Sequence, residues 1–165
     1  KVQQDGFIKS FTPIAQEQDK IIQVIAYCLM PTHIHFILKQ LSPSGISTFM
    51  SNILNSYTRY FNIKHHRKGP LWESKFKNVI VNNDEQLLHL TRYIHLNPTT
   101  ASLVKKPQDW EFSSYNEYLN NTNHPICQFE DLFEFKSKKY KEFVQDRIAY
   151  QRELAIIKKQ LIDES

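Results

Sequence analysis

The pattern of apolar positions predicts two strands and then a helix in the first part of the chain. Residues 21–30 are mostly apolar, and residues 33–40 alternate between the two faces of a strand after a break at Pro31. In residues 46–62 the apolar positions instead recur at helical spacing. They form a stripe that consists of Ile46, Phe49, Met50, Ile53, Leu54, Tyr57 and Phe61. A strand pair followed by a packed helix indicates an α+β sandwich.

A second strong helix is predicted over residues 84–96. Asn83 or Asp84 can cap its first turn. Pro98 is expected to end it, because the residue before a proline is disfavoured in helical geometry. The buried stripe of this helix is expected to consist of Leu87, Leu90, Thr91 and Ile94.

The remaining segments carry weaker signals. Residues 6–20 have apolar positions at helical spacing, interrupted by Pro13, and residues 79–81 have the composition of a strand. The rest of the chain predicts a buried connector with a short helix start over residues 104–118, a short helix over residues 131–135, and a long charged amphipathic helix or helix pair over residues 138–163.

Composition narrows the class of protein without identifying a partner. At 165 residues the chain is expected to form one domain, and 3 glycines argue against long flexible linkers. A balance of 21 Lys and Arg against 17 Asp and Glu gives a net charge of +4, which permits a nucleic-acid partner without requiring one. The two cysteines lack metal or redox spacing, and the sequence shows no apolar run of membrane-spanning length and no signal peptide. These features are typical of a cytoplasmic protein.

The second predicted strand carries a pair of histidines. His33 and His35 are two residues apart, so both imidazoles share one face, while Ile34 and Phe36 are expected to face a core. Two adjacent imidazoles can hold a divalent ion and leave other coordination positions open. Most pairs with this spacing are ordinary half-buried strand residues, so the spacing alone leaves both interpretations open.

A basic segment rich in aromatic residues follows the first helix, over residues 64–77. Its cations can contact phosphates and its aromatic rings can stack on bases, and the candidates are Arg67, Lys68, Lys75, Lys77 and Trp72. The alternative is a solvated loop that Trp72 anchors to the core. Composition alone favours neither interpretation.

The second predicted helix presents a polar row beside its buried stripe. His89, Tyr93 and Asn97 follow one another at four-residue steps and therefore share a face. A tyrosine on a helix is most often a packing residue whose hydroxyl lies at the rim of the core. His95 lies two positions from Tyr93, faces elsewhere, and is interpreted as structural.

Four segments in this order resemble a known family. They are Ala-Tyr-Cys-Leu-Met-Pro-Thr-His-Ile-His at 26–35, Gly-Pro-Leu-Trp-Glu-Ser-Lys-Phe at 69–76, Arg-Tyr-Ile-His-Leu-Asn-Pro at 92–98 and Trp-Glu-Phe-Ser-Ser-Tyr at 110–115. Together they resemble the REP-associated branch of the single-tyrosine HUH transposases of bacterial insertion sequences. The resemblance extends from about Val24 to Tyr118 and more loosely to the C-terminus.

The resemblance implies a fold, a set of site residues and a cofactor. It implies an α+β fold with a ferredoxin-like antiparallel sheet and helices on one face, in a catalytic domain over residues 1–122 and a C-terminal helical extension over residues 123–165. It implies that His33 and His35 bind Mg²⁺ or Mn²⁺ and that Tyr93 is the nucleophile. Asn97, one turn after the tyrosine, corresponds to the third metal ligand, with His89 in reserve. The family fold begins with a strand ahead of the first helix, and the residues before Gly6 do not predict one.

The resemblance also implies a reaction. The protein is expected to nick and rejoin single-stranded DNA near hairpins through a 5′-phosphotyrosine intermediate, as a monomer or a homodimer. Two alternatives remain open at this point. One is a catalytically silent, domesticated DNA-binding protein, and the other is a metal-dependent phosphoesterase without a covalent intermediate.

Overall fold

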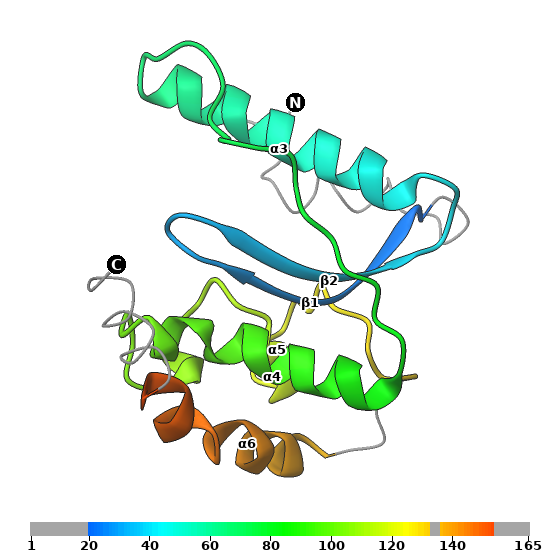
Figure 1. Ribbon diagram of the computed structural model, residues 1–165, viewed down its shortest axis with the longest axis vertical. Coiled ribbons are helices and arrows are strands. Elements are labelled where there is room, and N and C mark those ends of the chain that lie inside the picture. Colours follow the sequence, from blue (N-terminus) through cyan, green and yellow to red (C-terminus); the bar gives the residue numbers. More distant parts are fainter. Residues whose placement is uncertain (1–19, 133–135, 154–165) are drawn as a thin grey trace, which may run out of the picture. The chain divides into compact units, whose positions relative to one another are not determined.

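The computed structural model describes residues 20–132 and 136–153 (Figure 1). In chain order it contains β1 (Ile22–Leu29), β2 (Ile34–Gln40), α3 (Gly45–Lys64), α4 (Asp84–Thr100), the 3₁₀ turn η2 (Pro107–Asp109), α5 (Tyr115–Tyr118) and α6 (Ser137–Gln145). Helical residues resume at 148–153 after a turn at 146–147. The two strands pair as an antiparallel hairpin, and the α+β class and the helical C-terminal part are confirmed.

The described residues fall into two compact units. The first contains residues up to Gln23 together with Lys39–Asn78, and the second contains Val24–Leu38 together with the residues from Val79 onward. Among the described residues no helix is long and apolar enough to span a membrane.

In the first unit, the start of α3 lies directly against the backbone that leads into β1. The carbonyl of Ile21 accepts hydrogen bonds from the amides of Leu41 and Ser42, at 3.1 and 3.3 Å. A Cβ on Gly45 would overlap that same carbonyl oxygen. Only glycine therefore fits at the first residue of α3, and this contact fixes where the helix begins.

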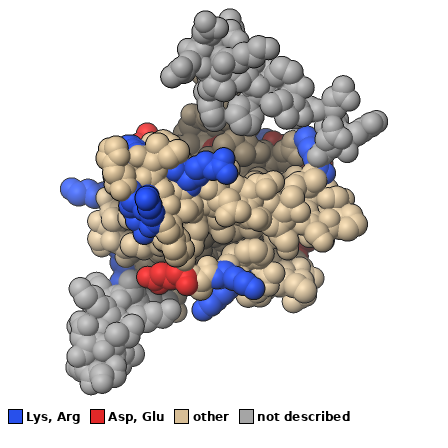
Figure 2. Space-filling view, turned by 90° about the horizontal axis from the view of Figure 1, so that it is seen from above, with Lys and Arg blue, Asp and Glu red and all other residues tan. Residues whose placement is uncertain are grey.

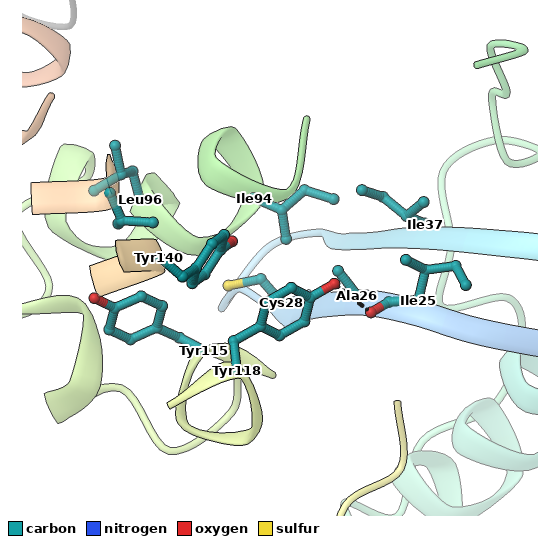
Figure 3. Close-up of a cluster of buried hydrophobic side chains, with 10 residues drawn as sticks. Ile25, Ala26, Cys28, Ile37, Ile94, Leu96, Tyr115, Tyr118 and Tyr140 are labelled. Atoms are coloured by element: carbon teal, nitrogen blue, oxygen red, sulfur yellow. Dashed lines mark hydrogen bonds between the residues drawn. The ribbon is translucent and has the colours of Figure 1, made fainter. Parts of the chain in front are cut away.

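The second unit is built around one buried cluster, which we call the central cluster (Figure 3). β1, β2, α4, α5 and α6 all contribute to it, and its members are Ile25, Ala26, Cys28, Ile37, Ile94, Leu96, Tyr115, Tyr118, Tyr140 and Val144. An isolated bridge between Cys28 and Ser113 attaches the segment before α5 to β1. β1 therefore pairs with β2 along one edge and contacts the α5 segment along the other.

α4 begins where the sequence predicts and ends later. The side chain of Asn83 caps it by accepting a hydrogen bond from the amide of Gln86, at 2.8 Å. The prediction that Pro98 ends the helix is wrong, because α4 continues to Thr100. Proline removes one helical hydrogen bond, but Leu96, Pro98 and Thr99 are all buried, and that burial offsets the loss.

The structure contradicts two further predictions, and a third concerns residues that it does not describe. Residues 79–81 are not a strand: Val79 and Ile80 are highly exposed and have no ladder partner in the part of the chain that the structure describes. In β2 the buried residue is Ile37, which shares the face of the histidines, whereas Ile34 and Phe36 are half-buried. Residues 6–19 of the predicted helix at 6–20, and residues 133–135 of the one at 131–135, lie outside the described residues.

Candidate functional site

A tight turn places the two histidines on one side of the β1–β2 hairpin. The amide of Met30 donates to the carbonyl of His33 at 2.8 Å, which closes the turn through Pro31 and Thr32. His33 is exposed and lies next to β2, and His35 is half-buried within β2. Their ring centroids are 4.8 Å apart at an interplanar angle of 85°. The alternation expected for a strand therefore brings both imidazoles together.

Tyr93 of α4 lies next to this pair. Its ring centroid is 6.0 Å from that of His35, at an interplanar angle of 75°. The tyrosine side chain is 47% exposed, whereas the following residue, Ile94, is buried in the central cluster. The burial of Ile94 therefore fixes the position of α4. The phenol of Tyr93 faces solvent beside His35.

The charge state of His35 suits a metal ligand. Burial, and to a smaller extent the neighbouring His33, lowers the pKa of His35 below its ordinary value. The neutral imidazole, which is the form that binds a metal ion, is therefore favoured at neutral pH. Among the described residues no group of three or more His, Cys, Asp or Glu side chains comes together. An ion on the histidine pair would need further oxygen donors, such as an amide, water or phosphate.

The two candidates for a third ligand, Asn97 and His89, occupy different surroundings on α4. Asn97 lies inside the helix, and its side-chain nitrogen is buried without a hydrogen-bond partner in the described structure. The ring of His89 is 5.8 Å from that of Phe143 in α6, and its Nδ1 lies 2.7 Å from the guanidinium of Arg92. An ion could coordinate only the side-chain oxygen of Asn97, while His89 already has neighbours on the α6 side of the helix.

The five predicted DNA-contacting residues all belong to the first unit, whereas His33, His35, Tyr93 and Asn97 belong to the second. Trp72 is half-buried, donates from its indole nitrogen to the carbonyl of Leu54 at 3.2 Å, and lies 5.9 Å from the ring of Tyr57. These contacts favour the interpretation that Trp72 anchors the loop to α3.

The cations of this loop are exposed. Arg67 donates to the carbonyl of Pro70 at 3.0 Å, which stabilises the turn, and Lys68, Lys75 and Lys77 are exposed to solvent. On the face drawn in Figure 2, Lys and Arg side chains are more prominent than Asp and Glu side chains among the described residues. Exposed cations of this kind suit contact with a polyanion.

Comparison with known proteins decides the family. The model of the family described as "Transposase IS200 like" matches residues 4–97, which is more than half of the chain and includes both histidines and Tyr93. The chain belongs to the IS200-like transposase family. No solved structure matches it.

A curated relative of this chain comes from Haemophilus influenzae and is named "Putative REP-associated tyrosine transposase". The two sequences are 23% identical over 113 residues, which cover 62% of this chain and 64% of the relative. The chain thus spans somewhat less than two thirds of the length of that relative. The family match and the name of this relative confirm the resemblance that the sequence indicates.

The structure contains a buried polar network around His95 that the sequence pattern does not indicate. His95 is fully buried, and its two ring nitrogens lie 2.6 Å from the hydroxyl of Tyr140 and 2.7 Å from the hydroxyl of Ser114. Burial lowers the pKa of His95 to about 3, so the ring is neutral. The interpretation of His95 as structural agrees with this environment, but its partners are 19 and 45 residues away in sequence.

A buried carboxylate completes the polar interior. Glu117 accepts a hydrogen bond from the hydroxyl of Tyr27 at 2.9 Å and from the amides of Ile126 and Cys127 at 2.9 and 2.7 Å. It therefore attaches the loop after α5 to β1. Periodicity could not reveal this role, because Glu117 occupies a polar position in a short helix.

Proposed function

We propose that this chain nicks and rejoins single-stranded DNA beside hairpins, through a covalent bond between Tyr93 and the 5′-phosphate. One observation carries the proposal: the phenol of Tyr93 lies half-exposed beside His35, whose imidazole is in turn adjacent to His33. A nucleophile next to a pair of imidazoles that could hold a metal ion suits phosphoryl transfer to a side chain.

In the proposed reaction the hydroxyl oxygen of Tyr93 attacks the scissile phosphorus. A bond forms between that oxygen and phosphorus, and the bond from phosphorus to the 3′ oxygen breaks. The phenol loses its proton, and the departing 3′ oxygen gains one through solvent. The new ester is close in energy to the one broken, so the 3′-hydroxyl of a second strand can reverse the step. Strand transfer then needs no ATP.

We propose Mg²⁺ or Mn²⁺ as the cofactor, with His33, His35 and Asn97 as the residues that would hold it. Neutral imidazole and amide oxygen are suitable donors, and Asn97 lies on α4 one turn after Tyr93. When bound, the ion supplies Lewis-acid stabilisation of charge on the phosphate oxygens. The residues of the chain supply the nucleophile and fix its position.

For DNA binding we propose Arg67, Lys68, Lys75 and Lys77 as phosphate contacts. Their exposure supports this role, since cations free to reach solvent can neutralise backbone phosphates. Trp72 is proposed to hold this loop against α3, through its contacts with Leu54 and Tyr57, so that the cations are presented to the DNA.

The test is formation of a protein–DNA adduct. The protein is incubated with Mn²⁺ and a labelled single-stranded oligonucleotide that carries a hairpin from the DNA flanking its own gene, and the products are separated on a denaturing gel. We expect a metal-dependent band of protein-linked DNA that Tyr93→Phe abolishes. Tyr150→Phe is the matched control, because Tyr150 is 50% exposed and lies outside the site.

The other outcomes separate the alternative functions. Cleaved DNA without a linked band, unaffected by Tyr93→Phe, would contradict the proposal and indicate a phosphoesterase. Binding of the oligonucleotide without cleavage or linkage would indicate a domesticated DNA-binding protein.

A further inference from the structure

Tyr93 has few contacts of its own that could fix its position. Its side chain is 47% exposed and contacts the ring of His35. In the described structure no hydrogen bond to its hydroxyl is present. Its position relative to the histidines therefore depends on where the backbone of α4 is held.

His95, two residues further along α4, is the most strongly held polar residue of that helix. It is fully buried, and both ring nitrogens lie at hydrogen-bonding distance from side chains of other elements. The hydroxyl of Tyr140 comes from α6, and the hydroxyl of Ser114 comes from the segment before α5. One side chain of α4 thus connects that helix to two elements that are distant in sequence.

The hydrogen bonds of Ser114 continue this connection to the sheet. Its hydroxyl donates to the carbonyl of Tyr27 at 3.2 Å, and it accepts from the amide of Tyr27 at 2.9 Å. Nε2 of His95 lies 2.7 Å from this same hydroxyl. Tyr27 lies in β1, which pairs with the strand that carries His35. A continuous path of hydrogen bonds therefore runs from the helix of Tyr93 to the hairpin of His35.

Tyr140 completes the arrangement from the C-terminal part of the chain. It is almost fully buried, and its ring packs 4.7 Å from that of Tyr118 within the central cluster (Figure 3). Other residues of the same segment support α4 along its length. The ring of Phe143 lies 4.1 Å from the guanidinium carbon of Arg92, and Arg152 donates to the carbonyl of Thr99 at 3.2 Å near the end of the helix.

We propose that His95 and Tyr140 are positioning residues for the reaction at Tyr93. Bonded to Ser114 on one side and to Tyr140 on the other, His95 sets the register of α4 against the β1–β2 hairpin, and so sets the distance from Tyr93 to His35. The C-terminal segment over residues 137–153 is then part of the catalytic unit. This inference rests on the proposed function of Tyr93.

The test compares two tyrosines that each lose one buried hydroxyl. Tyr140→Phe removes the hydroxyl that lies 2.6 Å from Nδ1 of His95 and that also hydrogen-bonds Thr91 of the same helix. Tyr118→Phe removes a donor to the carbonyl of Ile25 in β1, at 2.8 Å, and keeps the ring contact of residue 118 with His95, at 4.8 Å between ring centroids. Both rings keep their packing, so the two variants are matched in the size of the change. For each variant we would measure the single-turnover rate of adduct formation with the hairpin oligonucleotide and Mn²⁺, and separately its DNA affinity.

We expect Tyr140→Phe to slow adduct formation by about tenfold or more, since a small misplacement of a nucleophile has effects of that order, while DNA affinity stays within about twofold. Tyr118→Phe should leave the rate within about twofold. Equal slowing in both variants, or an unchanged rate in Tyr140→Phe, would overturn the proposal. If Tyr140→Phe does not fold, His95→Asn replaces it, because asparagine keeps an acceptor near Tyr140 and loses the contact with Ser114. This variant must then also slow adduct formation while its DNA affinity stays unchanged.

A second readout does not depend on activity. Amide hydrogen exchange over residues 91–97 should be faster in Tyr140→Phe than in Tyr118→Phe, because only the first change releases α4. If the native protein forms no adduct but this difference is present, the proposed function fails and the restraint on α4 stands. If adducts form but the exchange of α4 is the same in both variants, the function stands and the positioning role fails.

Discussion

The phenol ring of Tyr93 lies 6.0 Å from the imidazole of His35, although the two residues come from a helix and a strand 58 positions apart in sequence. His35 belongs to a short hairpin and Tyr93 to a helix whose next residue is buried in the same cluster as Ile37 of that hairpin. The site is therefore held by the central cluster of the second unit. Its proposed chemistry and its stability can be tested separately.

Removal of one imidazole should abolish metal-dependent activity. His35→Ala deletes the half-buried imidazole, and we expect loss of Mn²⁺ binding by at least about tenfold, as ligand loss typically produces, together with loss of the protein–DNA adduct. Isothermal titration with Mn²⁺ measures the first effect. His124→Ala, at an exposed residue of a distant loop, is the control and should bind Mn²⁺ as the unaltered protein does. Equal Mn²⁺ affinity in both variants would exclude the histidine pair as the metal site.

Acid should destabilise the fold through His95. Its pKa is lowered to about 3 in the folded protein from 6.5, so the unfolded chain binds a proton that the folded chain excludes. The stability from neutral His95 is complete above about pH 6.5 and is lost as the pH falls toward 3, by up to about 1.4 kcal/mol per unit.

Urea denaturation between pH 7.5 and pH 4.5 measures this loss. His95→Gln removes the titrating group and should show a shallower decline of stability with acid. The same decline in both proteins would contradict the assignment of the effect to His95.

The hydrogen bonds that Glu117 accepts should contribute more to the stability of the protein than its negative charge does. Glu117→Ala leaves the amides of Ile126 and Cys127 without their acceptor and should lower the free energy of unfolding by about 3–5 kcal/mol, since each buried unsatisfied group costs about 1–3 kcal/mol. Glu117→Gln can present its oxygen to both amides and its nitrogen to the hydroxyl of Tyr27, so about 1–2 kcal/mol is expected. Chemical denaturation of the two variants makes the comparison, and equal losses would contradict it.

Gly45→Ala should destabilise the protein against the trend of helix propensity. Alanine in place of a helical glycine would ordinarily stabilise by about 1 kcal/mol. At this position the added Cβ overlaps the carbonyl oxygen of Ile21, and such overpacking costs about 1–3 kcal/mol. Thermal or urea denaturation gives the sign of the change. Ser47→Ala, at an exposed residue of α3, is the control and should be neutral or slightly stabilising, and a Gly45→Ala protein of raised stability would contradict the overlap.

The parts of the fold that local pattern determines could be predicted from the sequence. β1, β2 and the starts of α3 and α4 follow from apolar spacing and from the cap at Asn83. The four quoted segments are enough to indicate the family, because their order and spacing are specific even where each is common by itself.

What the sequence could not predict depends on contacts between distant residues. α4 passes Pro98 because residues around the proline are buried, which no local rule reports. Residues 79–81 have strand composition but lack a neighbouring strand within the described ranges, and pairing requires a neighbour. The bond from His95 to Tyr140 spans 45 residues and joins two helices, so helical spacing on either one gives no sign of it.

The central claim is that Tyr93 becomes covalently linked to DNA, and one measurement addresses it directly. The protein is incubated with Mn²⁺ and the hairpin oligonucleotide, treated with nuclease and trypsin, and analysed by mass spectrometry. Cleavage after Arg92 and Lys105 yields a peptide that begins with Tyr93 and contains no other tyrosine. We predict that this peptide carries the mass of a 5′-linked nucleotide on Tyr93. A nucleotide on a different tyrosine, or cleaved DNA with this peptide unmodified, would contradict the account.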